Sequence, residues 1–319
     1  MIKIKPFQYT EKEYQGLVAL NNVVYPDAIS TVSEYRYSDE NRNPKCVLQR
    51  YIFEKDEQII ASYKYQHIIW SYHPQRLFVA VNVHPEHRNQ GIGSMMYDHL
   101  ASEMQLFNLI SLRAFARENE AHSVYFAEKR GFKEIMREVL SFLDITKFEP
   151  TAYDDVLQKV NDMDIKLISL EQFMDIDPDH KRKLYKLDRE LSRDLPSHTP
   201  ETPMDFMDFE KEVFSNPNLL PDGWTMALHG NDCIGVSMLF DSKGDKTKLY
   251  TGLTGVRRPY RRQGIAIAMK VKSIMYAKEH GFARIQTEND QNNPMFLLNQ
   301  KLGFVAQPSW IEYEKLLRI

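Results

Sequence analysis

One pattern occurs twice in the chain and constrains its fold more than any other feature. The segment 83–93 reads VHPEHRNQGIG, and the segment 256–266 reads VRRPYRRQGIA. Val, Arg, Gln, Gly and Ile recur in register, and matching residues such as Gly91 and Gly264 lie 173 positions apart. One such segment arises easily by chance, whereas two in register indicate a duplication. A chain of 319 residues has room for two domains, each with its own core.

Both segments lie where a predicted strand passes into a predicted helix. For the second segment, the strand is predicted over 249–254 and the helix over 265–280. The first N–H groups of a helix have no intrahelical partner, and the helix dipole places partial positive charge there. Gly264 lets the backbone approach a phosphate closely, because it has no Cβ. Four arginines around it add donors suited to phosphate oxygens: Arg257, Arg258, Arg261 and Arg262.

Other nucleotide-binding signatures fit these letters less well. A dinucleotide-binding turn needs Gly-x-Gly-x-x-Gly, but Gly91-Ile92-Gly93 is followed by Ser-Met-Met, and the second copy has Ala266 in place of its second glycine. A phosphate loop of the Gly-Lys-Ser/Thr type is absent. These letters therefore do not favour NAD or ATP as the ligand. The alternative is two ordinary turns with solvated arginines.

The two segments resemble the signature Arg/Gln-x-x-Gly-x-Gly/Ala of the GNAT superfamily of N-acetyltransferases. The resemblance implies an α/β (α+β) fold of two tandem domains, a plan similar to that of the mycothiol synthases. Each domain would hold a mixed, mostly antiparallel sheet flanked by helices, with central strands that splay apart to admit acetyl-CoA. The implied cofactor-binding residues are Val83, Arg88, Asn89, Gln90, Gly91, Ile92 and Gly93, and Val256, Arg261, Arg262, Gln263, Gly264, Ile265, Ala266 and Asn292.

The predicted elements follow the same order in both halves. We expect an N-terminal domain over 1–147, a connection over 148–163 and a C-terminal domain over 164–319. Near its end, each half has a helix that stops at a Gly-Phe pair, at 131–132 and at 303–304. The strands predicted over 132–143 and 310–315 are each expected to close the domain in which they lie.

The two halves differ in the residues available for chemistry. Many GNAT enzymes place a tyrosine four residues before the helix-ending glycine, where it can protonate the departing thiolate; here Ala127 and Asn299 stand there. Asn299 can hydrogen-bond the sulfur but supplies no proton, although a thiolate of pKa about 8.5 can take one from water. The second half carries more polar residues at the motif. We therefore expect turnover there, and a first half that is structural or binds the cofactor without turnover.

Transfer to an amine needs a group that takes the amine's proton, and Glu288 at the end of its strand is the candidate base. Its alternative role is that of a solvated surface carboxylate. A backbone N–H on the strand around Thr254 is expected to stabilise the oxyanion. The acceptor pocket is expected to be walled by Asp194, Trp224 and Thr254, where acid would suit a cationic amine, although Trp224 also fits a core position.

The expected function is acetyl-CoA-dependent transfer of an acetyl group to a primary amine of a small molecule or a protein, in a ternary complex. The alternative is a CoA-binding sensor or scaffold without turnover. A net charge of −3 argues against nucleic acid. No apolar run is long enough for a membrane span, and no metal is expected. Cys46 and Cys233 fall in different halves, which suits a reducing cytoplasm. A monomer or homodimer is expected.

Overall fold

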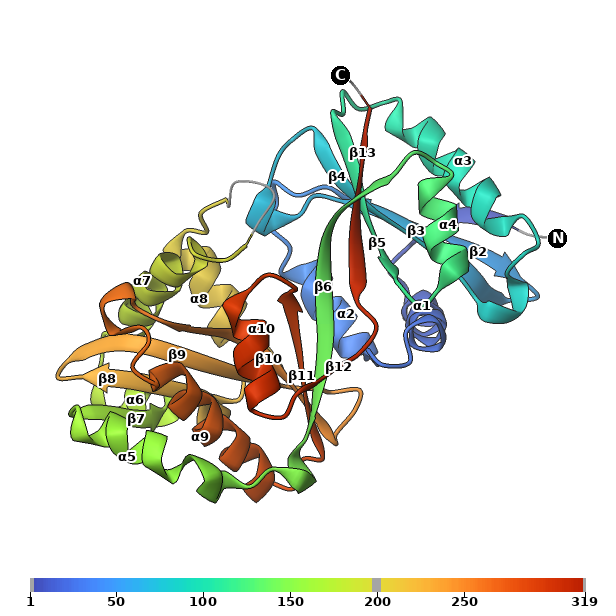
Figure 1. Cartoon of the computed structure of the whole chain (residues 1–319). Coiled ribbons are helices and arrows are strands. Elements are labelled where there is room, and N and C mark those ends of the chain that lie inside the picture. The colour runs from blue at the N-terminus through green and yellow to red at the C-terminus, as the bar shows by residue number, and fades with distance from the viewer. Residues whose placement is uncertain (1–2, 197–201, 318–319) are drawn as a thin grey trace. The chain divides into compact units, whose positions relative to one another are not determined.

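The computed structural model describes residues 3–196 and 202–317, and these form two compact units. The first unit holds the described residues up to Met136, those from Trp310 onward, and Thr202. The second unit holds the other described residues between Arg137 and Ser309. Each unit is a sheet with helices packed on it (Figure 1).

The sheet of the first unit has six strands. Their spatial order is β1 (Lys3–Pro6), β2 (Leu48–Lys55), β3 (Gln58–Gln66), β4 (Arg76–Val83), β5 (Ser111–Arg117) and β13 (Trp310–Leu316). All neighbours are antiparallel except β4 and β5, which are parallel. The helices are α1 (Glu11–Val24), α2 (Val32–Glu40), α3 (Ile92–Met104) and α4 (Ala121–Glu128).

Side-chain alternation along β2 places α1 and α3 on opposite faces of this sheet. Ile52 packs with Tyr14 and Leu17 of α1, whereas the next residue, Phe53, packs with the core cluster that includes Met96 of α3. Successive residues of a strand point to opposite faces. Met96 of α3 is therefore a core residue.

The sheet of the second unit repeats the plan. Its spatial order is β6 (Lys133–Asp144), β11 (Arg284–Asp290), β10 (Lys248–Val256), β9 (Asp232–Asp241), β8 (Thr225–His229) and β7 (Ile165–Ser169), with the short β12 (Val305–Ala306) also paired to β6. Only β10 and β11 are parallel. The helices are α5 (Asp154–Asp162), α6 (Leu170–Ile176), α7 (His180–Ser192), α8 (Phe206–Phe214), α9 (Ile265–Glu279) and α10 (Pro294–Lys301).

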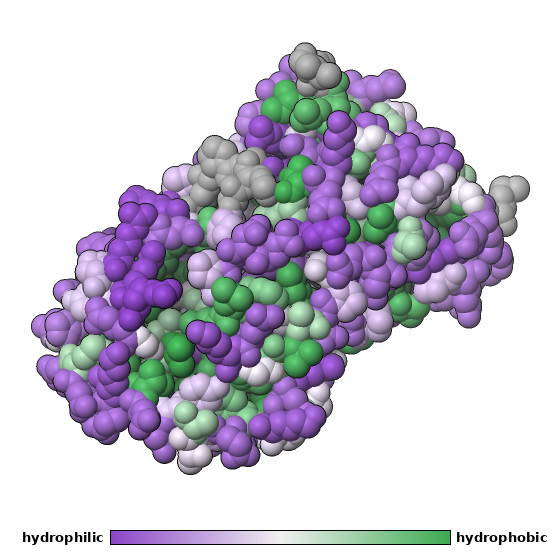
Figure 2. Space-filling model, in the orientation of Figure 1, coloured by the Kyte–Doolittle hydropathy of each residue, from purple (hydrophilic) through white to green (hydrophobic). Residues whose placement is uncertain are grey.

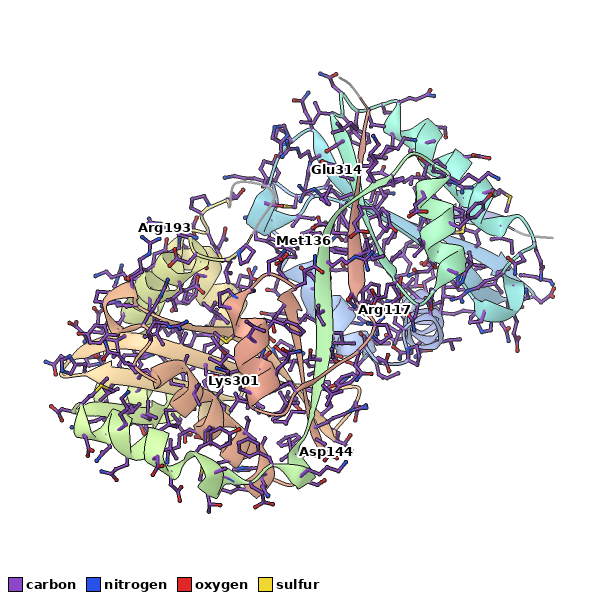
Figure 3. All side chains as sticks on the ribbon, viewed as in Figure 1. Arg117, Met136, Asp144, Arg193, Lys301 and Glu314 are labelled. Carbon is purple, nitrogen blue, oxygen red and sulfur yellow. The ribbon has the colours of Figure 1, made fainter. Side chains whose placement is uncertain are left out.

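One edge strand of each unit's sheet comes from the half of the sequence that forms most of the other unit. β13 pairs with β5 from Trp310 opposite Arg117 to Leu316 opposite Ser111, and β6 pairs with β11 from Glu138 to Asp144. Figure 1 shows the red strand β13 beside β5, and Figure 3 labels Glu314 on β13 and Met136 and Asp144 on β6. The expectation that 132–143 closes the first domain and 310–315 the second is wrong. Both strands follow a helix that ends in Gly-Phe, so local sequence does not distinguish their partners.

The central parallel strands of each unit diverge after three paired residues. β4 and β5 pair only from Arg76 to Phe78, although β4 continues to Val83. β10 and β11 likewise pair only from Lys248 to Tyr250. This is the splay that the family resemblance implies, and it occurs in both units.

The surface is mainly polar. On the face shown in Figure 2, hydrophilic side chains cover most of both units, with smaller hydrophobic groups among them. Cys46 and Cys233 are both free thiols and buried, one in each unit. Among the described residues, no helix combines the length and the apolar character that crossing a membrane would require.

Candidate functional site

The two glycine turns have the same backbone conformation. In the first turn Asn89 and Gly91 have φ of 59° and 80°, and in the second Arg262 and Gly264 have φ of 64° and 93°. These are left-handed values, which glycine adopts without steric cost. In both turns this glycine is the residue immediately before the helix, α3 or α9. The turns therefore present their first helical N–H groups in the same way.

The arginine that recurs in both turns is anchored to the strand before it. The Nε of Arg88 donates to the carbonyl oxygen of Val83 at 3.2 Å, and the Nε of Arg261 donates to that of Val256 at 2.9 Å. Each bond spans five residues and uses only one guanidinium nitrogen. The remaining N–H groups of each guanidinium stay available for another partner.

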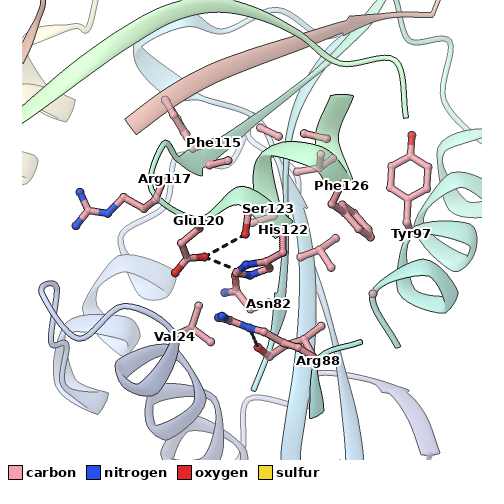
Figure 4. Close-up of a pocket in the computed structure, with 18 of the residues that line it drawn as sticks. Val24, Asn82, Arg88, Tyr97, Phe115, Arg117, Glu120, His122, Ser123 and Phe126 are labelled. Carbon is pink, nitrogen blue, oxygen red and sulfur yellow. Dashed lines mark hydrogen bonds and ion pairs between the residues drawn. The ribbon is translucent and has the colours of Figure 1, made fainter. Parts of the chain in front are cut away.

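A cavity of about 280 Å³ begins at the first turn (Figure 4). It lies where β4 and β5 diverge, and it is lined by residues of both strands, of the turn, of α3 and of α4. The lining includes Val79, Ala80, Val81, Asn82, Arg88, Gly91, Gly93, Ser94, Tyr97, Phe115, Arg117, Glu120, His122, Phe126, Ala127, Arg130 and Trp310.

The cavity draws its lining from both faces of the sheet. Along β4, Val79 and Val81 pack with the core under α3, so Ala80 and Asn82 point to the opposite face. Tyr25, which follows α1, also lines the cavity and donates its hydroxyl hydrogen to Oδ1 of Asn82 at 2.7 Å. A slot lined from both faces lets one ligand approach from each side of the sheet.

The end of the cavity nearest α3 is basic. Arg130 on the residues after α4 donates to the hydroxyl of Ser94 at 2.9 Å, and its guanidinium carbon lies 3.4 Å from the ring centre of Phe126. Arg88 and Gly91, the residue immediately before α3, line the same cavity. Guanidinium groups beside helical N–H donors suit a phosphate-bearing ligand.

The other end combines a carboxylate with aromatic side chains. The carboxylate of Glu120 accepts a hydrogen bond from Ser123 at 3.1 Å and lies 3.5 Å from Nε2 of His122 (Figure 4). Trp310 lies against Tyr25 with ring centres 5.6 Å apart, and the guanidinium of Arg117 lies 4.6 Å from the Trp310 ring centre. Burial raises the pKa of Tyr25 to about 12, so its hydroxyl keeps its proton at neutral pH.

The second turn has different surroundings. Arg258 donates from Nε to Asp194 at 3.2 Å, and the guanidinium of Arg261 also hydrogen-bonds this carboxylate. The hydrogen bonds from the two arginines hold the pKa of Asp194 well below its usual range. A Cβ placed on Gly264 would lie 2.9 Å from Cγ2 of Val156 in α5, whereas a Cβ on Gly91 would meet open space.

The sequence matches the profile of the Acetyltransferase (GNAT) family twice, over residues 14–132 and 184–304. The chain belongs to the GNAT family. The two matches cover one turn each, so the duplication is a tandem pair of GNAT domains.

Solved structures share this tandem GNAT fold. A tandem GNAT protein from the clavulanic acid biosynthesis pathway is 16% identical, with a TM-score of 0.77 over 100% of this chain and 99% of that one. A GCN5-related N-acetyltransferase from Sphaerobacter thermophilus is 15% identical, with a TM-score of 0.69 over 100% and 96%. Identity at this level shows the fold alone. No curated protein matches the sequence.

The predicted catalytic residues of the second GNAT domain lie on β11 and α10. Glu288 is exposed, and its carboxylate accepts a hydrogen bond from Gln286 at 3.2 Å. Asn299 is fully buried and donates to Oδ1 of Asn289 at 2.7 Å, which ties α10 to β11. The hydroxyl of Thr254 lies 3.3 Å from that of Ser237, and Asn292 is exposed in the turn after β11.

Two of the residues predicted to wall the acceptor pocket have other roles. Trp224 has no exposed surface, and its indole N–H donates to the carbonyl oxygen of Leu239 at 2.8 Å. It is a core residue, so the expectation that it floors a pocket is wrong. Asp194 is paired with arginines of its own domain, which leaves it no free charge to attract a cationic amine.

The prediction from sequence missed several residues that line the cavity of the first GNAT domain. Glu120 directly precedes α4, the helix before the Gly131-Phe132 pair, so a search of the residues before that pair would have found it. Tyr25 and Asn82 meet across 57 residues, and Trp310 arrives on the exchanged strand β13. Only tertiary structure brings these three together.

Proposed function

We propose that the protein is an acetyl-CoA-dependent N-acetyltransferase that transfers the acetyl group directly to a primary amine in a ternary complex. The observation that carries this proposal is the cavity between the diverging strands β4 and β5, which begins at a glycine turn and a helix N-terminus. Its lining combines arginines with a carboxylate and aromatic side chains. This is the arrangement that a charged donor and an amine acceptor need in order to meet.

The first turn suits the pyrophosphate of acetyl-CoA. The open space beside Gly91 lets phosphate oxygens reach the N–H groups at the start of α3. Arg88 and Arg130 add positive charge to the lining of the cavity. The pantetheine arm would then follow β4 from Val83 into the gap between the strands.

The splayed strand supplies the stabilisation of negative charge. Beyond Phe78, the register of β4 with β5 ends, so backbone N–H groups on that edge can donate to a thioester oxygen as it gains charge. The amine nitrogen bonds to the carbonyl carbon, the carbon–sulfur bond breaks, and a carboxylate takes the amine's proton. Water protonates the departing thiolate, because the position four residues before Gly131 is Ala127.

Two carboxylates compete for the role of base. Glu120 lines the cavity, and its side chain is 31% exposed, so it is accessible to an acceptor amine. Glu288, the base predicted from the sequence, lies near the end of β11 in the second domain. We favour Glu120 because it faces the cavity in which the donor is proposed to bind. Small-molecule and protein amines both remain candidate acceptors, in a cytoplasmic monomer or homodimer.

The decisive experiment measures the release of free thiol from acetyl-CoA across a panel of small amines and lysine peptides. Amine-dependent thiol release with an acetylated product supports the proposal. Binding of acetyl-CoA without release on any amine would support the alternative of a CoA-binding sensor. Failure to bind acetyl-CoA at all would overturn both.

A further inference from the structure

The second glycine turn is closed by groups of its own domain. α7 and the residue pair after it bring two carboxylates to the turn: Glu190 contacts Arg257 at 3.2 Å, and Asp194 receives hydrogen bonds from Arg258 and Arg261. Three of the four arginines that suggested a phosphate site are therefore paired with carboxylates within the chain. In the first domain, Arg88 has its bond to Val83 but no carboxylate partner among the ion pairs of the described residues.

Side chains of α5 and α7 also pack against glycines at and beside the second turn. Val156 of α5 lies so close to Gly264 that a Cβ there would approach its Cγ2 to 2.9 Å. Leu191 of α7 lies equally close to Gly255, because a Cβ on that glycine would be 2.9 Å from its Cδ1. Gly255 corresponds to Asn82, which in the first domain lines the open cavity. Gly264 of the second turn and Gly255 of the strand before it are thus each covered by an apolar side chain.

We propose that Asp194 stands in for a ligand phosphate at the second turn, so that the chain binds one acyl-CoA, at the first turn. A carboxylate that accepts from two guanidinium groups satisfies the same donors that a pyrophosphate would. The pairing also fixes the end of α7 to the start of α9. The second domain thus has the fold of an acyl-CoA site, but the carboxylate of Asp194 occupies the position at which the ligand phosphate would bind. This inference rests on the proposed function, since it assigns the donor to one of two similar turns.

Arg88 and Arg261 provide a matched test, because they hold corresponding positions and anchor to corresponding valines. Calorimetric titration of the full chain with acetyl-CoA should give one site. Arg88→Ala should weaken acetyl-CoA binding about tenfold or more, and Arg261→Ala should leave the affinity within about twofold. Two sites in the unmodified chain, or a larger loss from Arg261→Ala, would overturn the inference. No binding at all would instead count against the proposed function.

A second pair of variants tests the carboxylate itself. In a Gly91→Asp background the first turn is disabled. The new side chain meets open space, and although the left-handed φ of 80° strains a residue with a Cβ, aspartate is among the residues that adopt it most readily, so folding should be retained. This background should bind neither acetyl-CoA nor inorganic pyrophosphate. Adding Asp194→Asn keeps the size of the side chain and frees Arg258 and Arg261, so pyrophosphate should now bind. Equal binding, or equal absence of binding, with Asp194 and with Asn would overturn the role assigned to the carboxylate.

Discussion

Trp310 packs against Tyr25 with ring centres 5.6 Å apart, and both residues line the cavity of the first GNAT domain. The tryptophan comes from the last strand of the chain, and the tyrosine follows the first helix. The wall of the proposed acceptor end is therefore built from two segments that are far apart in the sequence.

Replacement of Trp310 tests this wall. Trp310→Ala removes the contacts with Tyr25 and Arg117, each worth about 1 kcal/mol. We expect a higher KM for the amine and little change in acetyl-CoA affinity, measured by steady-state kinetics and calorimetry. Trp70, which is 64% exposed, is the control, and Trp70→Ala should change neither quantity. An unchanged amine KM in Trp310→Ala would place the acceptor elsewhere.

The base is identified by comparing carboxylates. Glu120→Gln keeps the shape of the side chain and removes its ability to take a proton, so kcat should fall by about 10²- to 10⁴-fold with acetyl-CoA affinity nearly constant. The exposed Glu118, two residues away, is the control, and Glu118→Gln should have little effect. If Glu288→Gln is instead the damaging change, turnover belongs to the second domain, as the sequence predicted.

A buried lysine makes the stability of the second domain depend on pH. Lys270 is 3% exposed, and burial lowers its pKa from 10.5 to about 8. Between about pH 8 and 10.5 the unfolded chain binds more protons than the folded chain, so stability should rise with pH across that window. Below pH 8 the full penalty for the buried charge applies.

Lys270→Met should therefore raise the free energy of unfolding at pH 7, by on the order of 2 kcal/mol, and should flatten the rise above pH 8. The measurement is denaturant unfolding at several pH values. Lys272 on the same helix is exposed, and Lys272→Met should leave the pH dependence as it is. A destabilising Lys270→Met would mean that the contact of the ammonium group with the Phe304 ring, whose centre lies 5.5 Å away, outweighs the cost of burial.

The exchange of β6 and β13 predicts that the halves do not fold separately. A fragment of residues 1–147 lacks β13, which leaves the edge of β5 unpaired and prone to association. It should elute as aggregates in size-exclusion chromatography. The same fragment joined through a flexible linker to residues 308–317 should elute as a folded monomer. A well-folded monomer without β13 would contradict this prediction.

Local sequence patterns predicted the turns and most helices and strands of this fold, but not which strands pair. The glycine turns could be predicted because their chemistry is contained within eleven residues. The partner of β13 could not, because pairing with β5 depends on contacts across 199 residues, such as that from Arg113 to Glu312. The helix α6 was missed although Ser169 and Gln172 form a capping box at its start.

The candidate site divides in the same way. Arg88 and Gly91 were predicted from the motif, and they lie on the cavity. The pairing of Asp194 with Arg258 and Arg261 depends on where α7 ends in space, and nothing in the spacing of 64 and 67 residues indicates it. Polar composition favoured the second half as the catalytic one, whereas the cavity between β4 and β5 lies in the first.

The position of β13 in the sequence also determines when the sheet of the first unit can be completed during translation. Synthesis runs from the N-terminus, and the sheet of the first unit needs Trp310–Leu316, which are translated after the residues of the second unit. The first unit must therefore wait, with β5 exposed, while the whole second unit is translated. Translation of β13, rather than completion of the first half, sets the moment at which the cavity acquires the wall that contains Trp310.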